Sequence, residues 1–507
     1  MNQKFYNHHI LVTFVCTNIS DMNQSVRSLQ PTAIWNRFAD LNAVPRASKK
    51  EERVIAFMTK FGKDLGLETS IDHVGNVIIK KPASPGMEDR KTVVMQSHLD
   101  MVHQKNSDTN FDFDTQGIEM LVDGDWVRAN GTTLGADNGL GVATIMAILE
   151  SDSIVHPALE ALFTIDEETG MTGAMGLQGG ILSGDILLNL DTEEDDEIGV
   201  GCAGGVDVTA TANYAHVNTP ENYLGYAIAI KGLQGGHSGM DIHKGLANAN
   251  KLMNRILYGI QEYLLIDMID GGSLRNAIPR ESTSQFIVKN SDVNNLTKEY
   301  NRITKNIKKE FASLEPELSI ELLPLEQTPT SVMPKVFQTR LLQAIYTAHN
   351  GVYRMSPEIT DLVETSNNIA RVLVKDGTAH IACLTRSSVE SGKWDLANAL
   401  TASFELMGAK VTYGGDYPGW APNMQSPILE VMEGLYTKLY GEKPHVAACH
   451  AGLECGILGT NYPDMDMISF GPTIKGAHSP DERASISSVQ KYWKFVQEIL
   501  KNIPKKA

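Results

Sequence analysis

The sequence predicts an α/β fold in which a mixed sheet flanked by helices is joined to a second, α+β unit. Strand-like apolar runs alternate with helical segments between residues 32 and 190, and this alternation is typical of a sheet with partly parallel order. The pattern changes after Gly204-Gly205, where an α+β arrangement of strands and helices begins. Near the C-terminus the chain returns to a helix, a strand and a helix.

Two helices and four strands are expected in the first part of the chain. Apolar side chains recur at helical spacing across residues 32–67, for example at Ile34, Phe38 and Leu41. A further helix is expected over residues 138–150. Compact β-type runs predict strands at residues 76–80, 92–98, 159–165 and 185–190.

The second unit is expected to contain strands at residues 225–231 and 284–289 and helices at residues 245–263 and 295–313. Residues 413–420 carry enough Gly and Pro to predict a loop in which the chain crosses back to the first sheet. The remaining elements are expected at residues 428–440 (helix), 465–470 (strand) and 487–501 (helix).

Length and charge limit the classes of function. The chain has 507 residues, which exceeds what one hydrophobic core usually covers, so two or more domains are expected. It carries 61 acidic and 44 basic residues, and its net charge of −17 would repel a phosphate backbone or an anionic membrane surface. We therefore expect neither nucleic acid nor a membrane as a partner.

The cysteines and the N-terminus favour a cytoplasmic location. The five cysteines are scattered and none forms a Cys-x-x-Cys pair, as expected in a reducing compartment. Residues 1–21 contain one Lys and only a short apolar run, which is a weak match to a secretory signal. We treat residues 1–21 as an N-terminal extension, and a start of translation at Met22 stays open.

The first candidate motif is His98-Leu99-Asp100, which ends an apolar strand. The two-residue period of a strand puts His98 and Asp100 on one side. A metal-bound imidazole typically donates its other N–H to a carboxylate, so Asp100 is suited to orient His98. Taken alone, the motif is better explained by a surface ion pair.

The second candidate is Asp137, which lies in the glycine-rich segment 131–141 just before a predicted helix. A helix N-cap would explain an Asp at this position. It would not explain the density of glycine, which indicates backbone packed closely around a site.

Three further segments place polar side chains after apolar strands. The run Asp166-Glu167-Glu168 precedes a glycine turn, Asp191 follows the next strand, and His478 lies in a loop after a later strand. Adjacent carboxylates repel each other, so a nearby cation is the economical explanation for the run. Solvated loop acids are the alternative.

These residues are expected to meet at one edge of the sheet, because ligands of open α/β sheets gather at the carboxyl ends of strands. The strand-end donors are two imidazoles and several carboxylates, with no thiolate: His98, Glu167, Glu168, Asp191 and His478. This set suits zinc and, less selectively, manganese or cobalt. The sequence therefore predicts a divalent metal site.

Together, the motifs resemble the zinc-dependent exopeptidase and aminoacylase superfamily in their order and spacing. The resemblance is carried by residues 98–100, 135–139, 166–168, 189–191 and 477–479. Residues 232–239, 276–281 and 450–454 further resemble the aminoacyl-histidine dipeptidase branch, also called peptidase D. The match runs from about residue 30 to the C-terminus.

The resemblance implies two zinc ions, with manganese or cobalt as alternatives, and assigns a role to each site residue. His98 and Asp191 would hold one ion, Glu168 and His478 the other, and Asp137 would bridge them. Two cations about 3.5–4 Å apart activate a shared hydroxide that attacks the peptide bond. The catalytic residues would be Glu167, as the general base, and Asp100, behind His98.

The resemblance also implies an inserted α+β lid domain. It would comprise residues 206–412, between the two parts of a catalytic domain at residues 22–205 and 413–507. In this lid, His237 resembles the residue that stabilises the tetrahedral oxyanion, with a purely structural histidine as the alternative.

Three further residues are expected to bind substrate by the same resemblance. Asn276 and Arg386 would contact the substrate carbonyl and the C-terminal carboxylate. For Arg386, a surface ion pair explains the sequence nearly as well. Gly452 would allow close approach of the peptide backbone.

The expected function is hydrolysis of dipeptides, with Xaa-His dipeptides as the first candidates. A tripeptidase, a carboxypeptidase or an N-acyl amino acid deacylase would need the same metal ligands and stays open. A non-catalytic metal-binding protein is the alternative of another class, and the pair Glu167-Glu168 argues against it. The family resemblance makes a homodimer possible.

Overall fold

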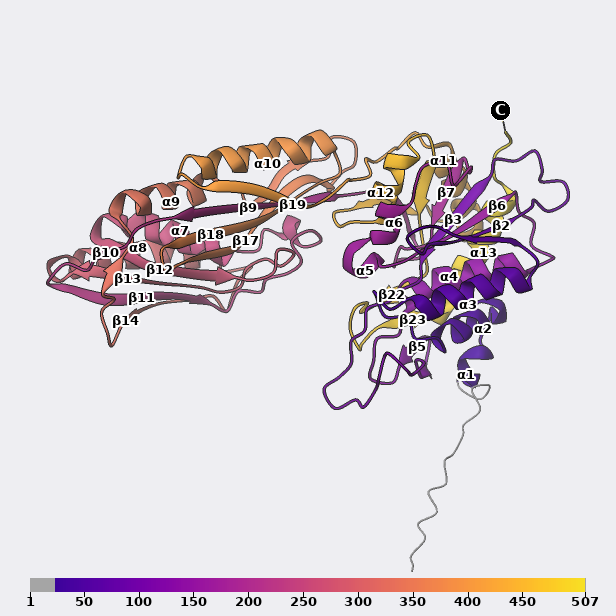
Figure 1. Ribbon diagram of the computed structural model, residues 1–507, viewed down its shortest axis with the longest axis horizontal. Coiled ribbons are helices and arrows are strands. Elements are labelled where there is room, and N and C mark those ends of the chain that lie inside the picture. Colours follow the sequence, from indigo (N-terminus) through magenta and orange to yellow (C-terminus); the bar gives the residue numbers. More distant parts are fainter. Residues whose placement is uncertain (1–22, 507) are drawn as a thin grey trace, which may run out of the picture. The chain divides into compact units, whose positions relative to one another are not determined.

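The computed structural model describes residues 23–506 (Figure 1). The predicted N-terminal extension, residues 1–21, and the alternative start at Met22 lie outside this range. The chain divides into two compact units. Within the described range, unit 1 comprises residues 23–197, 431–443 and 469–506, and unit 2 comprises residues 198–430 and 444–468. The predicted lid, residues 206–412, falls inside unit 2, and its role as a lid stays a prediction.

Between residues 23 and 506, none of the helices has the length and apolar character needed to cross a membrane. No disulfide joins the cysteines in this range, which are Cys202, Cys383, Cys449 and Cys455.

A mixed eight-stranded sheet confirms the predicted α/β class. In spatial order its strands are β1 (Glu68–Ile71), β2 (Val77–Lys81), β6 (Leu159–Thr164), β3 (Val93–His98), β7 (Ile186–Asn189), β21 (Asp466–Ser469), β8 (Glu197–Cys202) and β20 (His445–Cys449). β3 runs parallel to both β6 and β7, whereas β1, β2 and β6 pair antiparallel. Every residue of β3, β6 and β7 is buried, as in sheets covered on both faces. The four strands predicted from apolar runs are β2, β3, β6 and β7.

Helices precede and follow these strands along the chain. They are α1 (Gln24–Arg27), α2 (Thr32–Asn42), α3 (Glu52–Asp64), α4 (Ala136–Glu150), α5 (Glu167–Gly170), α6 (Thr172–Gly176), α11 (Pro427–Tyr440), α12 (Glu454–Asn461) and α13 (Ile486–Lys501). α4 is apolar on all sides and almost completely buried. A Cβ at Gly141 would lie 2.4 Å from Ser97 Oγ, so glycine lets α4 approach the end of β3.

A separate four-stranded sheet flanks the predicted His478 loop. Its spatial order is β22 (Ile474–Lys475), β23 (Arg483–Ser485), β5 (Trp126–Ala129) and β4 (Met120–Asp123). β22 and β23 pair antiparallel, so the loop between them leaves and re-enters one sheet edge. The two ends of the His478 loop are thereby fixed.

Unit 2 contains a nine-stranded sheet in which all neighbouring strands are antiparallel. The order is β14 (Ser319–Pro324), β11 (Tyr223–Lys231), β13 (Ser282–Lys289), β12 (Leu264–Gly272), β17 (Val363–Lys375), β18 (Thr378–Ser387), β9 (Gly204–Asn213) and β19 (Lys410–Tyr417), with β16 (Gly351–Met355) beside β17. A short pair is formed by β10 (Val217–Asn218) and β15 (Ser331–Val332).

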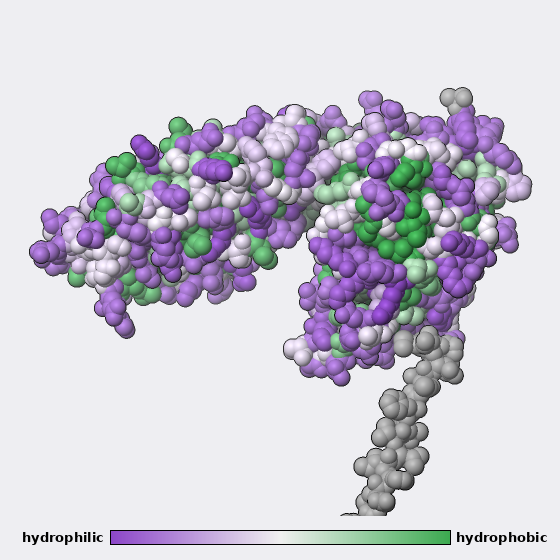
Figure 2. Space-filling view, in the orientation of Figure 1, coloured by the Kyte–Doolittle hydropathy of each residue, from purple (hydrophilic) through white to green (hydrophobic). Residues whose placement is uncertain are grey.

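One hydrophobic core joins this sheet to its helices, which are α7 (Ala249–Ile260), α8 (Val293–Glu310), α9 (Lys335–Thr347) and α10 (Glu390–Glu405). The sheet consists of two halves with the same strand order. One half is β14-β11-β13-β12, the other is β19-β9-β18-β17, and they meet where β12 pairs with β17. Figure 2 shows that hydrophilic residues cover most of the visible surface of both units.

Two predicted boundaries are wrong. The segment 413–420 was expected to be a loop, but its first residues, up to Tyr417, belong to the edge strand β19. Glycine is tolerated there because the pairing with β9 shifts register between Gly414 and Tyr417. The helix expected at residues 245–263 begins later, at Ala249 in α7, because the side chain of Asn248 caps its first turn. A 3-10 helix at Gln261–Tyr263 continues it to the expected end.

We expect Asn248→Ala to destabilise unit 2 by about 2–3 kcal/mol. Asn248 is buried, accepts the N–H groups of Asn250 and Lys251, and donates to Ile369 O at 3.1 Å. The loss combines an N-cap with buried groups left unpaired. Chemical denaturation measures the change. Asn295→Ala, on the exposed surface of α8, is the control, and equal unfolding midpoints for the two variants would contradict this account.

Candidate active site

Three parallel strands end at one edge of the sheet and carry most of the predicted site residues. His98 is the last residue of β3 and lies opposite Thr164, the last residue of β6. β6 leads into Glu167 and Glu168, and β7 leads into Asp191. Because parallel strands finish together, these side chains come close to His98.

His98 makes contacts through both ring nitrogens. Its Nδ1 atom lies 3.3 Å from Oδ1 of Asp100, an arrangement typical of a metal-binding imidazole oriented by a carboxylate. Its Nε2 atom lies 3.2 Å from Oδ1 of Asp137 and 3.6 Å from Oδ1 of Asp191. The ring is only 1% exposed, so these contacts are shielded from water.

Asp137 connects His98 to the remaining candidates. Its Oδ2 atom lies 3.2 Å from Nε2 of His478, which in turn lies 3.0 Å from Oε2 of Glu168. Potential ligand atoms of His98, Asp137 and Asp191 lie within 4.8 Å of one another. The same holds for Asp137, Glu168 and His478. The structure therefore brings the five predicted ligands together in two groups that share Asp137. His98, Glu167 and Glu168 form a third group by the same distance.

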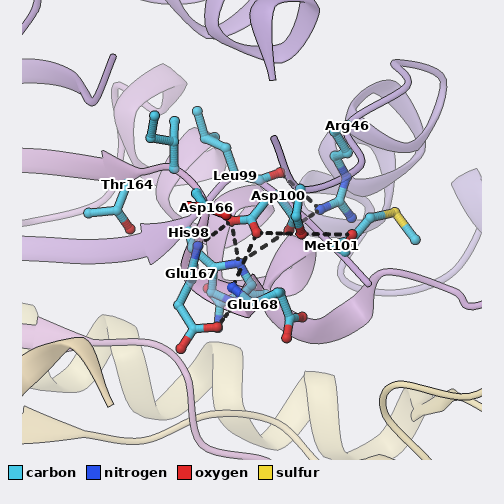
Figure 3. Close-up of polar contacts among 12 residues, drawn as sticks. Arg46, His98, Leu99, Asp100, Met101, Thr164, Asp166, Glu167 and Glu168 are labelled. Atoms are coloured by element: carbon cyan, nitrogen blue, oxygen red, sulfur yellow. Dashed lines mark hydrogen bonds and ion pairs between the residues drawn. The ribbon is translucent and has the colours of Figure 1, made fainter. Parts of the chain in front are cut away.

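Asp100 fixes the turn that carries the acid run (Figure 3). Its carboxylate accepts the N–H of Glu167 at 3.0 Å, the N–H of Glu168 at 3.3 Å and the hydroxyl of Ser48 at 2.8 Å. Burial raises the pKa of Asp100, but the contacts with His98 and these donors reverse the effect and lower its pKa. The ionised carboxylate therefore joins the end of β3 to the turn after β6.

The backbone is strained at two positions beside the candidate ligands. Asp166 has φ = 52° and His478 has φ = 63°, in a left-handed region that costs a non-glycine residue about 1–3 kcal/mol. The carboxylate of Asp166 accepts hydroxyl groups from Thr169 and Thr172, and its N–H donates to Glu51. Such over-determined strain is characteristic of functional sites.

The carboxylates dominate the electrostatics of the site. Burial alone lowers the pKa of His98, but Asp191, Asp100 and Asp137 outweigh it and leave the pKa well above its usual value. Hydrogen bonds to Asp137 and Glu168 raise the pKa of His478 to about 11. Both rings are therefore protonated at neutral pH in the metal-free protein, where they supply positive charge that the carboxylates require.

The four predicted substrate-binding residues all belong to unit 2. His237 follows β11, and Asn276 lies between β12 and β13. Arg386 lies on β18, and Gly452 lies between β20 and α12.

Three of these residues lie around one loop. A Cβ at Gly239 would lie 3.2 Å from both His237 Cε1 and Arg386 Nε, and 2.2 Å from the carbonyl oxygen of His450. The N–H of Ser238 donates to the carbonyl of Asn276 at 2.7 Å. Gly452 is not within these contacts but follows His450 by two positions.

We call His237, Asn276 and Arg386, together with the loop around Gly239, the loop cluster. Two of its side chains have defined hydrogen-bonding states. Nδ1 of His237 accepts the N–H groups of Gly239 and Met240 at 3.2 and 3.0 Å, so the neutral ring carries its proton on Nε2. Arg386 is 5% exposed and donates to the hydroxyl of Tyr417 at 2.8 Å, while its buried Nε has no hydrogen-bond partner. A buried guanidinium with an unused N–H is suited to an anionic ligand.

Comparison with known families identifies the class of protein. Residues 94–502 match Peptidase family M20/M25/M40. The chain belongs to this family. It is therefore a peptidase, an enzyme that hydrolyses peptide bonds.

Individual relatives of this M20 peptidase support the assignment. The chain is 44% identical over 482 residues to the cytosol non-specific dipeptidase of Escherichia coli K12, which spans 94% of this chain and 99% of the relative. The crystal structure of aminoacylhistidine dipeptidase from Vibrio alginolyticus matches with a TM-score of 0.90 and 43% identity, over 95% of this chain and 99% of that one. Aminopeptidase PepT from Bacillus cereus shares the fold at 16% identity and a TM-score of 0.55, over 94% and 99% of the two chains.

Several supporting residues of the M20 peptidase were missed from the sequence. Ser48 donates to the carboxylate of Asp100, and Glu51 accepts the N–H of Asp166 in the acid-run turn. The side-chain amide of Asn138 donates to Asp191. Arg46 and Glu482 bind the loops around the candidate ligands. Of these, Asn138 and Glu482 lie inside segments with a recognisable motif, and the others carry no local signal.

We expect the binding of divalent cations to release protons and to weaken as the pH falls. His98 and His478 both have a raised pKa, and an imidazole must lose its proton before it binds a metal ion. Protons and cations therefore compete, and the apparent Kd should rise from about pH 8 to about pH 6. Calorimetric zinc titrations in two buffers of different ionisation enthalpy count the protons released. Identical heats in both buffers would contradict the competition.

Proposed function

We propose that this M20 peptidase is a dipeptidase, with Xaa-His dipeptides among its substrates, and that it acts in the cytoplasm. The observation that carries the proposal is the pair of histidine–carboxylate groups that share Asp137. The dipeptide specificity rests on the E. coli and Vibrio relatives, each matched over 99% of its length, and the location rests on the E. coli relative alone.

We propose that the two groups hold two divalent metal ions, with zinc preferred over manganese or cobalt. The donors fit: imidazole and carboxylate without thiolate suit these ions, and Oε1 of Glu168 is buried without a hydrogen-bond partner. His98 and Asp191 would hold one ion, Glu168 and His478 the other, and Asp137 both. When bound, the two ions supply the charge that activates water and stabilises the developing oxyanion.

Glu167 is the proposed general base. Its carboxylate is mostly buried, and its Oε2 lies 4.0 Å from Nε2 of His98. Its N–H is held by Asp100, so the side chain starts from a fixed backbone position. Glu167 would take the proton of the attacking water and return it to the leaving amine. Asp100 would keep the Nε2 atom of His98 directed at Asp137 and Asp191.

We propose that the loop cluster of unit 2 binds the substrate. Arg386 would bind the C-terminal carboxylate by donating its unused Nε–H, since guanidinium groups pair with carboxylates strongly and directionally. The Nε2–H of His237 would donate to the tetrahedral oxyanion. Asn276 would contact the substrate carbonyl, and Gly452 would leave room for its backbone. A homodimer is retained as a proposal from the family resemblance, testable by light scattering.

We expect Glu167→Gln to lower kcat by about 10²–10⁴-fold and to leave the metal content unchanged, because the variant keeps the side-chain shape but loses the base. Steady-state kinetics and elemental analysis of the same preparation measure both effects. Glu194→Gln is the control, since Glu194 pairs with the surface residue Lys475. Loss of metal in Glu167→Gln would show that Glu167 is a ligand rather than the base.

The proposed function is tested by hydrolysis of a substrate panel before and after metal is restored to the chelated protein. The panel contains Xaa-His and other dipeptides, β-Ala-His, their C-terminal amides, tripeptides and N-acyl amino acids. We expect metal-dependent cleavage of dipeptides, with the amides cleaved at least about tenfold more slowly because Arg386 loses its anion. Faster cleavage of tripeptides or N-acyl amino acids than of dipeptides would contradict the proposed substrate class and assign one of those classes instead. Metal binding without hydrolysis of any compound would favour the non-catalytic alternative.

A further inference from the structure

Two buried side chains of opposite charge lie behind the candidate metal ligands and have no part in the proposed reaction. Arg46 follows α2 and Glu482 is the last residue of the His478 loop, and each is 2% exposed. Burying a charge is costly unless its hydrogen-bonding groups find partners. The identity of those partners therefore indicates what the two residues are for.

Arg46 binds backbone carbonyl groups on both sides of His98 and Asp137. Its Nη1 atom donates to the carbonyls of Leu99 and Asp100 at 3.1 and 3.0 Å, directly after His98 (Figure 3). Its Nη2 atom donates to the carbonyl of Gly135 at 2.5 Å, two residues before Asp137. One rigid guanidinium thus sets the distance between the chain segments that present His98 and Asp137.

Arg46 also supplies positive charge to the site. Burial lowers its pKa to about 10, opposed by the carboxylates of Glu482, Asp100, Asp137 and Glu168. The guanidinium therefore remains protonated at neutral pH. Its hydrogen bonds go to carbonyls and to the side chain of Asn42, so its charge stays available to the surrounding carboxylates.

The carboxylate of Glu482 binds the backbone N–H groups of the same glycine-rich loop. Its two carboxylate oxygens accept four consecutive backbone N–H groups at 2.7–3.2 Å, those of Leu134, Gly135, Ala136 and Asp137. Glu482 lies four residues after His478. It therefore links the chain segment that presents His478 to the one that presents Asp137.

Arg46 and Glu482 hold the loop 134–137 between them. Arg46 donates to the carbonyl of Gly135, whereas Glu482 accepts the N–H groups of Gly135 and its neighbours. A Cβ at Gly135 would lie 2.5 Å from Nη2 of Arg46, and Gly135 has φ = 69°. The glycine at this position is required both by the backbone conformation and by the guanidinium.

We propose that Arg46 and Glu482 are positioning residues that fix the carboxylate of Asp137 relative to His98 and His478, so that the two metal ions are bound at the separation that catalysis requires. The inference rests on the proposed metal centre. It assigns to Arg46 the distance from Asp137 to His98, and to Glu482 the distance from Asp137 to His478. Neither residue is among the proposed metal ligands or substrate-binding residues.

The test uses full-length Arg46→Lys and Glu482→Gln. Lysine keeps the charge but presents all its donors from one nitrogen, so it does not reproduce the two nitrogens with which Arg46 reaches two chain segments. Glutamine keeps the shape but cannot accept four N–H groups. The matched controls are Arg90→Lys and Glu160→Gln. Arg90 donates to the carbonyl of Ile503 at 2.8 Å, and buried Glu160 accepts the N–H groups of Ser183 and Gly184, all at the opposite end of the strands.

The first readout is metal affinity, measured by competition with a chelator, without reference to activity. We expect Arg46→Lys and Glu482→Gln to bind zinc about 10–100-fold more weakly, the usual effect of removing support from metal ligands. The visible spectrum of the cobalt-loaded variants should also shift, because the ligand geometry changes. Both controls should match the parent protein in affinity and in spectrum, even where their melting temperatures fall.

The second readout separates positioning from general destabilisation. We expect kcat at saturating metal to fall while KM changes less than about threefold, since substrate contacts are untouched. Unchanged affinity and spectrum in folded Arg46→Lys and Glu482→Gln would overturn the proposal, as would equal losses in the two controls. If the parent protein binds two metal ions but cleaves nothing on the panel, the proposed function fails, and the affinity and spectral results still decide this inference.

Discussion

Repulsion among carboxylates is the constraint on which the arrangement of unit 1 depends. Asp100, Asp137, Glu167, Glu168 and Asp191 converge on His98 and His478 at one sheet edge. Like charges at such distances cannot all stay ionised without compensation. The metal-free protein compensates by protonating both histidines, by directing backbone N–H groups at Asp100, and by burying a guanidinium behind the site. These compensating charges and hydrogen bonds hold the candidate ligands close together, in an arrangement suited to bind divalent cations.

The site is held at two levels that contribute differently. Parallel pairing of β3 with β6 and β7 brings the strand ends to one edge, and this follows from buried apolar strands alone. Strand pairing places each candidate ligand only in the region where its strand ends and does not fix the position of its side chain. We attribute the finer placement to buried polar residues that bind backbone rather than ligand: Arg46, Glu51 and Glu482. Precise ligand geometry therefore depends on residues that would attract no notice as catalytic.

The sequence predicts the first level well and the second poorly. Apolar runs and glycine-rich loops are local signals, so the central strands, α4 and the grouping of the predicted ligands follow from the pattern of residues. Arg46 has no such signal, because its role depends on carbonyls 53 and 89 positions away. The strand at Lys410–Tyr417 was missed for a related reason, since its pairing with β9 overrides the glycine content of the segment.

The long sequence separation within the site has a consequence for the synthesis of the protein. His478 and Glu482 contact Asp137 across 341 and 345 positions, with the whole of unit 2 between them. Translation therefore delivers most of the ligand set early and the elements that complete it late. An unfinished chain lacks one histidine and the carboxylate that holds the Asp137 loop, however well its first strands have folded. The proposed centre therefore becomes complete only after residue 482 has been made, which ties the onset of peptide-bond hydrolysis to a late stage in the synthesis of the chain.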